Sequence, residues 1–292
     1  MENIFIRLKA GFKRGDFLYR LIFINTLVFL IASLWLVVTR LFNLEQVSFL
    51  RYFELPSNLH TLLLQVWSFF TYMFLHTDFL HLLFNMLWLY WFGKMALKWF
   101  SEKQIVGIYI LGGLFGGILY ILAYNLFPMF NEVVYSSYLL GASASVLAIV
   151  VATAMIAPNE SVFLMFLGAV KLKYIAIFVV ALSFVNVISD NAGGNIAHLG
   201  GALFGYLFVV LYMKGYDMTK WINKIFDKIV DWFKPAPKMK VRKGGRQMDM
   251  DYNKRKKEEM DEIDAILDKL KRSGYDGLSS DEKKKLFNAG KK

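Results

Sequence analysis

The sequence predicts an all-α, polytopic membrane protein, a bundle of six transmembrane helices, from three observations. Of its 292 residues, 57% are hydrophobic and 17% are aromatic, whereas roughly half of the residues are apolar in an average soluble domain. The apolar residues gather in stretches close to the ~20 residues that cross a hydrocarbon core of about 30 Å. Lysine and arginine are concentrated in alternate connections between these stretches, as in membrane proteins of defined orientation.

Six stretches qualify as membrane spans. No small-residue cleavage site follows the first one, which is also too long for a signal-peptide core, so we expect it to be retained. The fifth is short, and the apolar segment 162–170 before it could extend it backward. The predicted spans are 18–39, 79–98, 104–127, 138–157, 173–188 and 195–213.

The distribution of positive charge predicts that both termini are cytosolic. The long first loop contains only Arg40 and Arg51, and residues 128–137 and 189–194 contain no lysine or arginine. Cytoplasmic segments carry the excess of basic residues, and an even number of spans agrees with two termini on one side. The basic residues on the predicted cytosolic side are Arg7, Lys9, Lys13 and Arg14 in the N-terminal arm 1–17, then Lys94, Lys98, Lys103, Lys171 and Lys173.

Small residues predict close packing of helices within the membrane domain, residues 18–214. In the sixth span, Ala197, Gly201 and Gly205 recur every four residues. The third span carries two overlapping pairs of glycines with the same spacing, at positions 112, 113, 116 and 117. Residues of this kind at this spacing allow helix backbones to approach closely in lipid.

The chain changes character after the sixth span. Residues 215–233 alternate apolar and charged side chains with helical periodicity, which predicts an amphipathic helix lying in the membrane interface. We expect 234–255 to be a basic flexible linker and 256–292 to form a small cytosolic helical hairpin, with Ser279 and Glu282 as a capping box. The hairpin is either a solvated appendage or a docking unit for a cytosolic partner.

Charge and cysteine content exclude several classes of function. The net charge of +11 resides mainly in the N-terminal arm and the C-terminal tail, so we expect a lipid bilayer with an anionic surface, and no nucleic acid, as partner. The absence of cysteine excludes disulfides, cysteine nucleophiles and thiolate metal sites.

Strongly polar side chains inside predicted spans are costly and are therefore functional candidates. His81 and Asn85 differ by four positions and share one face of the second span. His76 precedes this pair, and His198 lies beside the small residues of the sixth span. These groups could bind a metal with Asp78, join helices by polar contacts, or perform acyl transfer. No HExxH motif is present and no carboxylate has ligand spacing within a span, so we expect no metal.

The segment YLLGASASVLAIV, residues 138–150, supplies a serine for acyl transfer. A serine needs a base to remove its proton, and the oxyanion that develops needs fixed donors. No Asp or Glu within these spans can orient the base, which predicts a Ser–His dyad without a carboxylate. Ser143 and Ser145 are separated by about 200° around a helix, so only one can face His198. Gly141 favours Ser143, and we expect Ser145 to face another helix or to donate to the Gly141 carbonyl.

Three segments together resemble the rhomboid intramembrane serine proteases. They are WSFFTYMFLHTDFLHLLFNM, LLGASA and AHLGGALFG, in this order on the second, fourth and sixth spans, and the resemblance extends over about residues 15–214. It implies a six-helix rhomboid-like bundle in a bacterial plasma membrane. It also implies that no cofactor is needed, and that single-span membrane proteins are cleaved in or near their spans.

The resemblance also implies roles for individual residues. Ser143 would be the nucleophile and His198 the base. The pair His81 and Asn85 would stabilise the oxyanion with the Ser143 N–H. Gly141 and His76 would support the loop. Ala197, Gly201 and Gly205 would pack the sixth span against the fourth.

Two positions depart from the family pattern, in which glycine follows the serine and an aromatic residue comes one turn later. Ala144 and Leu147 occupy these positions here. The alternative function is therefore a catalytically inactive relative that binds transmembrane helices. Such a protein has no chemical reason to keep all four of Ser143, His198, His81 and Asn85, which favours the enzyme. A transporter would show repeated halves, and the sequence shows no convincing internal repeat.

Overall fold

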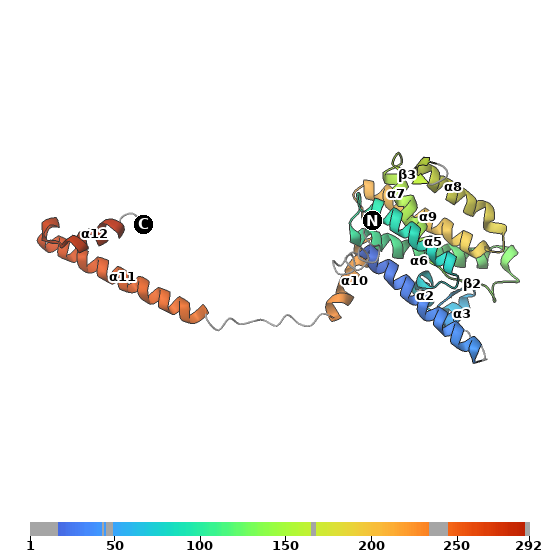
Figure 1. Cartoon of the computed structure of the whole chain (residues 1–292), viewed down its shortest axis with the longest axis horizontal. Coiled ribbons are helices and arrows are strands. Elements are labelled where there is room, and N and C mark those ends of the chain that lie inside the picture. Colours follow the sequence, from blue (N-terminus) through green and yellow to red (C-terminus); the bar gives the residue numbers. More distant parts are fainter. Residues whose placement is uncertain (1–16, 43, 45–48, 165–167, 234–244, 290–292) are drawn as a thin grey trace. The chain divides into compact units, whose positions relative to one another are not determined.

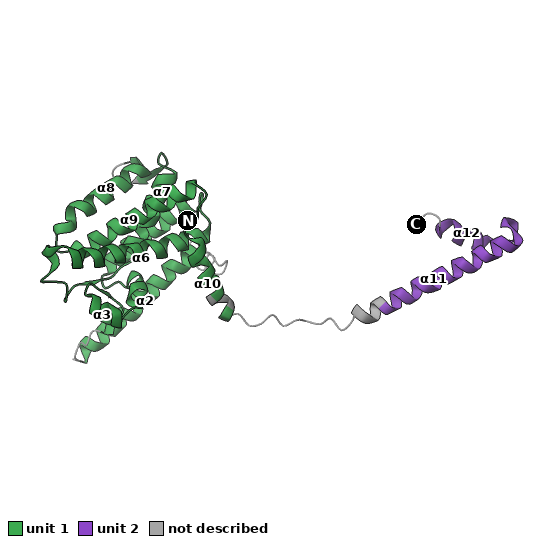
Figure 2. Cartoon of the chain, turned by 180° about the vertical axis from the view of Figure 1, so that it is seen from behind, with its two compact units in different colours: residues 1–233 green, residues 234–292 purple. Residues whose placement is uncertain are grey.

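A computed structural model describes residues 17–42, 44, 49–164, 168–233 and 245–289. The chain divides into two compact units, residues 1–233 and 234–292, which Figure 2 shows in different colours. The N-terminal arm predicted at 1–17 lies outside the described residues except for Phe17, so its basic residues are not described.

The predicted all-α bundle is confirmed, and each predicted span corresponds to one helix (Figure 1). Three of the helices, α2, α6 and α9, have both the length and the hydropathy to cross a membrane, whereas α7 and α8 are shorter apolar helices. The six are α2 (Phe17–Leu41), α5 (Phe79–Ala96), α6 (Glu102–Leu126), α7 (Ser143–Ile156), α8 (Leu172–Val185) and α9 (Ala192–Met213).

Short elements fold the connections onto the bundle. Strands β1 (Leu55–Pro56) and β2 (Tyr138–Leu139) pair antiparallel, with Leu55 opposite Leu139. This pairing joins the long first loop to the segment that enters α7. The other short elements here are η1 (Phe49–Tyr52), α3 (Leu59–Leu64), α4 (Ser68–Thr71), η2 (Tyr72–Phe74), η3 (Pro128–Phe130) and η4 (Asn186–Ile188).

One predicted boundary and one possible extension of a span differ from the structure. The fourth helix begins at Ser143 and not at 138, because Gly141, with φ of 116°, interrupts the chain after β2. The fifth helix does not extend back through 162–170, because Ser161–Leu164 (β3) and Gly168–Lys171 (β4) are strands that pair antiparallel. Alternate residues of β4 are more exposed, the period of a strand and not of a helix.

Helix α7 is the centre of the bundle, and α2 lies at its edge. Of the 14 residues of α7, all those from Ala144 to Ala154 are buried. Only 17% of the apolar window in α2 is buried within the protein. A helix that is apolar all round and buried on all sides is expected in the core of a bundle.

Glycines allow the backbones of α6, α7 and α9 to approach one another closely. A Cβ added at Gly201 would overlap the carbonyl of Ala144, and one added at Gly205 would overlap the carbonyl of Ala148. Gly112 of α6 receives the methyl group of Ala148 from the other side. Because 201 faces 144 and 205 faces 148, α7 and α9 run in parallel with residues one turn apart in register.

The amphipathic helix predicted at 215–233 is observed as α10 (Lys220–Phe233). Ile222 is buried, and the ring of Phe226 lies 6.5 Å from that of Phe70. Asp227 forms an ion pair of 2.7 Å with Lys103 at the start of α6. Trp221, in contrast, is largely exposed. One side of α10 therefore contacts the bundle and another carries exposed apolar side chains.

The C-terminal unit consists of α11 (Gly245–Ser273), η5 (Tyr275–Gly277) and α12 (Ser280–Ala289). Helix α11 begins at Gly245, inside the segment 234–255 expected to be a linker, and Arg246, Gln247 and Met248 in its first turn favour helix. The predicted capping box is formed. Glu282 accepts a hydrogen bond of 2.7 Å from the Ser279 N–H, and the Glu282 N–H donates to the Ser279 hydroxyl at 3.3 Å.

We predict that Gly205→Val lowers the apparent melting temperature of the purified protein, because the added side chain overlaps the Ala148 backbone. Overpacking of this kind costs about 2 kcal/mol or more. Leu203→Val places the same residue on an exposed face of α9 and serves as the control. Equal melting temperatures for the two variants would contradict the packing described.

We predict that Glu282 titrates far below the ordinary glutamate pKa of 4.5. The Lys269 ammonium and the Ser279 N–H donate to its carboxylate and lower its pKa to about 2. A depressed pKa means that these contacts stabilise the hairpin above pH 4.5 and are lost as the pH falls through about 2. The carboxyl ¹³C shift of Glu282 followed by NMR measures this. Lys269→Gln is expected to raise the midpoint, and an unchanged midpoint would contradict the assignment.

Candidate active site

The candidate residues converge because three helices begin at the same end of the bundle. Ser143 is the first residue of α7, His81 lies in the first turn of α5 and His198 lies in the second turn of α9. Gly141, two residues before α7, contacts His81 of α5, since a Cβ at Gly141 would lie 2.7 Å from Cε1 of His81. Gly201 joins α9 to α7 at Ala144.

Ser143 occupies a helix start with unsatisfied backbone donors. The N–H groups in the first turn of a helix have no intrahelical acceptor. In α7 the N-cap residue, Ala142, has no side chain that could accept a hydrogen bond from them. Ser143 is half-buried, and its hydroxyl makes no hydrogen bond to any residue that the structure describes. A half-open hydroxyl at the positive end of a helix dipole suits attack on a carbonyl.

Ser145 faces a different neighbour. It is fully buried, and its hydroxyl lies 3.9 Å from the Met73 sulfur. A Cβ at Gly113 of α6 would lie 2.6 Å from the same hydroxyl. Of the two arrangements expected for Ser145, the first is therefore observed: its hydroxyl is directed at another helix, α6, and does not donate to the Gly141 carbonyl. This position suits packing against α6.

His198 is held by a side chain of α8. Its Nδ1 lies 3.2 Å from the hydroxyl of Ser183 on α8. No hydrogen bond joins it to Ser143 in the described part of the chain. The register of α7 and α9 nevertheless brings His198, one turn before Gly201, to the level of the residues just before Ala144. Catalytic hydrogen bonds are often loose until substrate is bound.

The segment before Ser143 is fixed by the first loop and α6. Gly141 has φ of 116°, a conformation that side chains rarely adopt, and its N–H donates to the Tyr72 carbonyl at 3.0 Å. The Tyr72 hydroxyl in turn donates to the Gly113 carbonyl at 2.5 Å. Tyr72 was not among the residues expected from the sequence, and only its place in the fold reveals this role.

His76 and Asn85 connect α5 to the same segment. His76 is fully buried, and its Nε2 lies 3.4 Å from the Ala142 N–H and 3.4 Å from the Asn85 amide nitrogen. Asn85 also donates to the His81 carbonyl at 2.9 Å. The rings of His76 and His81 stand edge to face, with centroids 5.2 Å apart. The side chains of His76, His81 and Asn85 form one polar cluster beside the start of α7.

The two departures from the family pattern are both buried in the bundle. A Cβ at Gly116 would lie 2.7 Å from the Ala144 methyl group and 2.9 Å from the Ala197 carbonyl. The methyl of Ala144 is thus accommodated by a glycine on α6. Leu147 is 4% exposed.

Ser183 is the polar neighbour of His198 that the sequence did not reveal. The serine is visible in the apolar run IAIFVVALSFV, residues 175–185. Its separation of 15 residues from His198 follows no helical period, so only the packing of α8 against α9 brings the two together.

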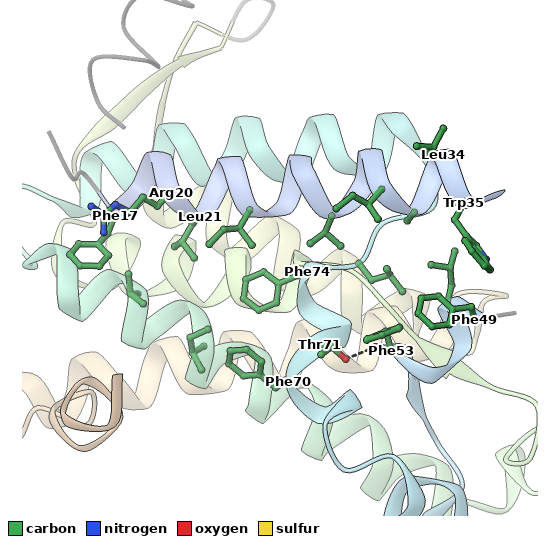
Figure 3. A pocket seen from close by; sticks show the side chains of 18 of the residues that line it. Phe17, Arg20, Leu21, Leu34, Trp35, Phe49, Phe53, Phe70, Thr71 and Phe74 are labelled. Atoms are coloured by element: carbon green, nitrogen blue, oxygen red, sulfur yellow. Dashed lines mark hydrogen bonds between the residues drawn. The ribbon is translucent and has the colours of Figure 1, made fainter. Parts of the chain in front are cut away.

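A groove of about 870 Å³ runs along α2, away from these residues (Figure 3). Its walls are apolar apart from a few groups, such as Thr71, whose hydroxyl donates to the Phe53 carbonyl at 2.9 Å. The candidate residues Ser143, His198, His81 and Asn85 are not among the residues that line this groove. Among the described residues, no three His, Cys, Asp or Glu side chains are grouped to hold a metal ion.

Comparison with known proteins identifies two regions. Residues 63–215, more than half of the chain, match the Rhomboid domain. Residues 246–292 match a family of unknown function, DUF6576. The chain is 26% identical over 153 residues to RHOMBOID-like protein 12, mitochondrial, from Arabidopsis thaliana. The match covers 49% of this chain and 44% of that relative, so this chain spans less than half of the relative's length.

We predict that Gly141→Ala destabilises the protein more than Gly168→Ala. Both glycines have positive φ, 116° and 71°, so both variants incur backbone strain. Only Gly141 faces a neighbour, the His81 ring, whereas nothing lies within 4 Å of a Cβ at Gly168. Strain at one position costs about 1–3 kcal/mol, and the clash adds to it. Thermal unfolding of the two variants measures the difference, and equal losses would contradict the contact with His81.

Proposed function

The chain belongs to the rhomboid family, and from that premise we propose that it is an intramembrane serine endopeptidase. One observation carries the proposal. Ser143, His198 and the pair of His81 and Asn85 lie on three helices, α7, α9 and α5, that begin at one end of the bundle, where α7 packs against both α5 and α9. Nucleophile, base and hydrogen-bond donors are the three parts that acyl transfer needs.

Ser143 is the proposed nucleophile and His198 the proposed general base. With Nδ1 of His198 near Ser183, Nε2 is the nitrogen left to accept the Ser143 proton. The serine oxygen attacks the scissile carbonyl carbon, and the imidazolium then protonates the leaving amine. The resulting acyl-enzyme is hydrolysed by a water whose proton passes to the same nitrogen.

Stabilisation of the oxyanion is the proposed role of the Ser143 N–H and of the Asn85 and His81 side chains. The N–H belongs to the open first turn of α7, where the helix dipole also favours negative charge. The Asn85 amide faces His76 at 3.4 Å, a long contact that a developing oxyanion could replace. His76 has a supporting role, because it holds Ala142 directly before the nucleophile.

Single-span membrane proteins are the proposed substrates. An extended peptide must present its carbonyl to Ser143, and a helix that opens in lipid loses backbone hydrogen bonds. A cluster of polar side chains within the bundle supplies partners for them. Segments with small or helix-destabilising residues open at lower cost, so we expect cleavage in or near the membrane at such segments.

The proposed orientation has both termini in the cytosol of a bacterium and the site toward the opposite face of the plasma membrane. Basic residues support it. Lys98, Lys103, Lys171 and Lys173 lie at the ends of helices remote from Ser143. Lys98 is ion-paired with Glu160 at 2.9 Å. The orientation of a membrane protein nevertheless follows the number of lysines and arginines in its loops and not their net charge.

A fluorophosphonate probe on the purified protein tests the proposal. We expect wild type and Ser145→Ala to be labelled, and Ser143→Ala and His198→Ala to lose labelling. Cleavage of a single-span substrate should fall at least about 10³-fold in the latter two, as in other serine proteases. Ser145→Ala is the matched control, because it removes a hydroxyl two residues away that faces α6.

Two results would contradict the proposal. Equal labelling of Ser143→Ala and wild type would exclude Ser143 as the nucleophile. A folded wild type that neither reacts with the probe nor cleaves any substrate would leave the alternative function, an inactive family member that binds transmembrane helices.

A further inference from the structure

The hydroxyl of Ser183 differs in its partner from the threonine hydroxyls of α2 and α7. Thr26, Thr39 and Thr153 each donate to the carbonyl four residues earlier in the same helix, the common arrangement within apolar helices. Ser183 instead reaches across to another helix, where its oxygen lies 3.2 Å from Nδ1 of His198.

The position of Ser183 on α8 is equally selective. The buried residues of this 14-residue helix are Leu172, Ala176 and Ser183. The residues on either side of Ser183 are exposed, Leu182 to 49% and Phe184 to 70%. The polar group is therefore on the narrow face that α8 turns toward α9, and a buried hydroxyl needs a partner there.

We propose that Ser183 is a positioning residue for His198, an inference that rests on the proposed function. A histidine that accepts a proton at Nε2 must carry its hydrogen at Nδ1. The Ser183 oxygen accepts a hydrogen bond from this Nδ1–H. It thereby favours the tautomer with a free lone pair at Nε2 and fixes the rotation of the ring.

The same contact serves the later step. When His198 has taken the Ser143 proton, its Nδ1–H still donates to Ser183, and a hydrogen bond from a charged donor is stronger than one between neutral groups. Ser183 thus performs, without charge, the orienting task that a carboxylate performs in a Ser–His–Asp triad. The absence of Asp and Glu from the spans that carry Ser143 and His198 is thereby explained.

The inference is tested first by ¹⁵N NMR of the full-length protein with labelled histidine. The chain has four histidines, and His198→Ala identifies the resonances of His198. We expect its Nδ1 to be protonated and its Nε2 unprotonated in wild type. In Ser183→Ala the population should shift toward the Nε2–H tautomer. An unchanged tautomer in Ser183→Ala overturns the inference, whether or not the protein is active.

Kinetics of cleavage supply the second test. We expect Ser183→Ala to lower kcat about tenfold or more, the effect of one hydrogen bond to a group that becomes charged, with KM changed less than about twofold. Ser183→Thr keeps the hydroxyl and should restore most of kcat. Ser189→Ala is the control, because its exposed hydroxyl donates to the Asn186 carbonyl and accepts from the Asn195 amide, and does not bond to His198.

The outcomes separate this inference from the proposed function. If wild type is unreactive toward the fluorophosphonate, the proposed function fails and the NMR comparison alone decides the role of Ser183. If wild type is active but kcat of Ser183→Ala stays within about twofold of it, the positioning role is wrong. A fall in kcat that merely follows a loss of folded protein, measured by thermal unfolding, also overturns it.

Discussion

The backbone contact between α7 and α9 is the constraint on which the rest of the structure depends. Lipid tails are as apolar as leucine side chains, so helices in a bilayer gain little from burying apolar surface and depend on close packing. Gly201 and Gly205 remove the side chains that would hold the helices apart. The same contact sets the register that brings His198 to the level of Ser143, so packing and chemistry are joined in one interface.

Hydrogen bonds between elements then fix the loops that complete the site. The hydroxyl of Tyr109 on α6 donates to the Met73 carbonyl at 3.0 Å, and the Asn25 amide of α2 donates to that hydroxyl at 3.0 Å. Tyr72 links α6 to Gly141, because its hydroxyl donates to the Gly113 carbonyl and its own carbonyl accepts from the Gly141 N–H. Buried polar groups in a low-dielectric interior are costly unless paired. The pairs therefore hold Tyr72 and Met73 of the first loop beside the helix start that carries Ser143.

The candidate site could be predicted only in part. His81 and Asn85 are four residues apart on one helix, so their common face follows from helical geometry. The choice between Ser143 and Ser145 followed from Gly141 and the family motif, and the structure adds that Ser145 is directed toward Met73 on the first loop and Gly113 on α6. Ser183 was not predicted, because contacts between helices follow no sequence period.

The sequence by itself determined the fold class and the six apolar helices, because span length, hydropathy and loop charge are local properties matched to a bilayer. The tertiary structure decided where α7 begins, that 161–164 and 168–171 form a hairpin, and which side chain contacts Nδ1 of His198. These features depend on the rotation and depth of one helix against another. A shift of one residue turns a helical side chain by about 100°, and the apolar pattern alone does not fix position so finely.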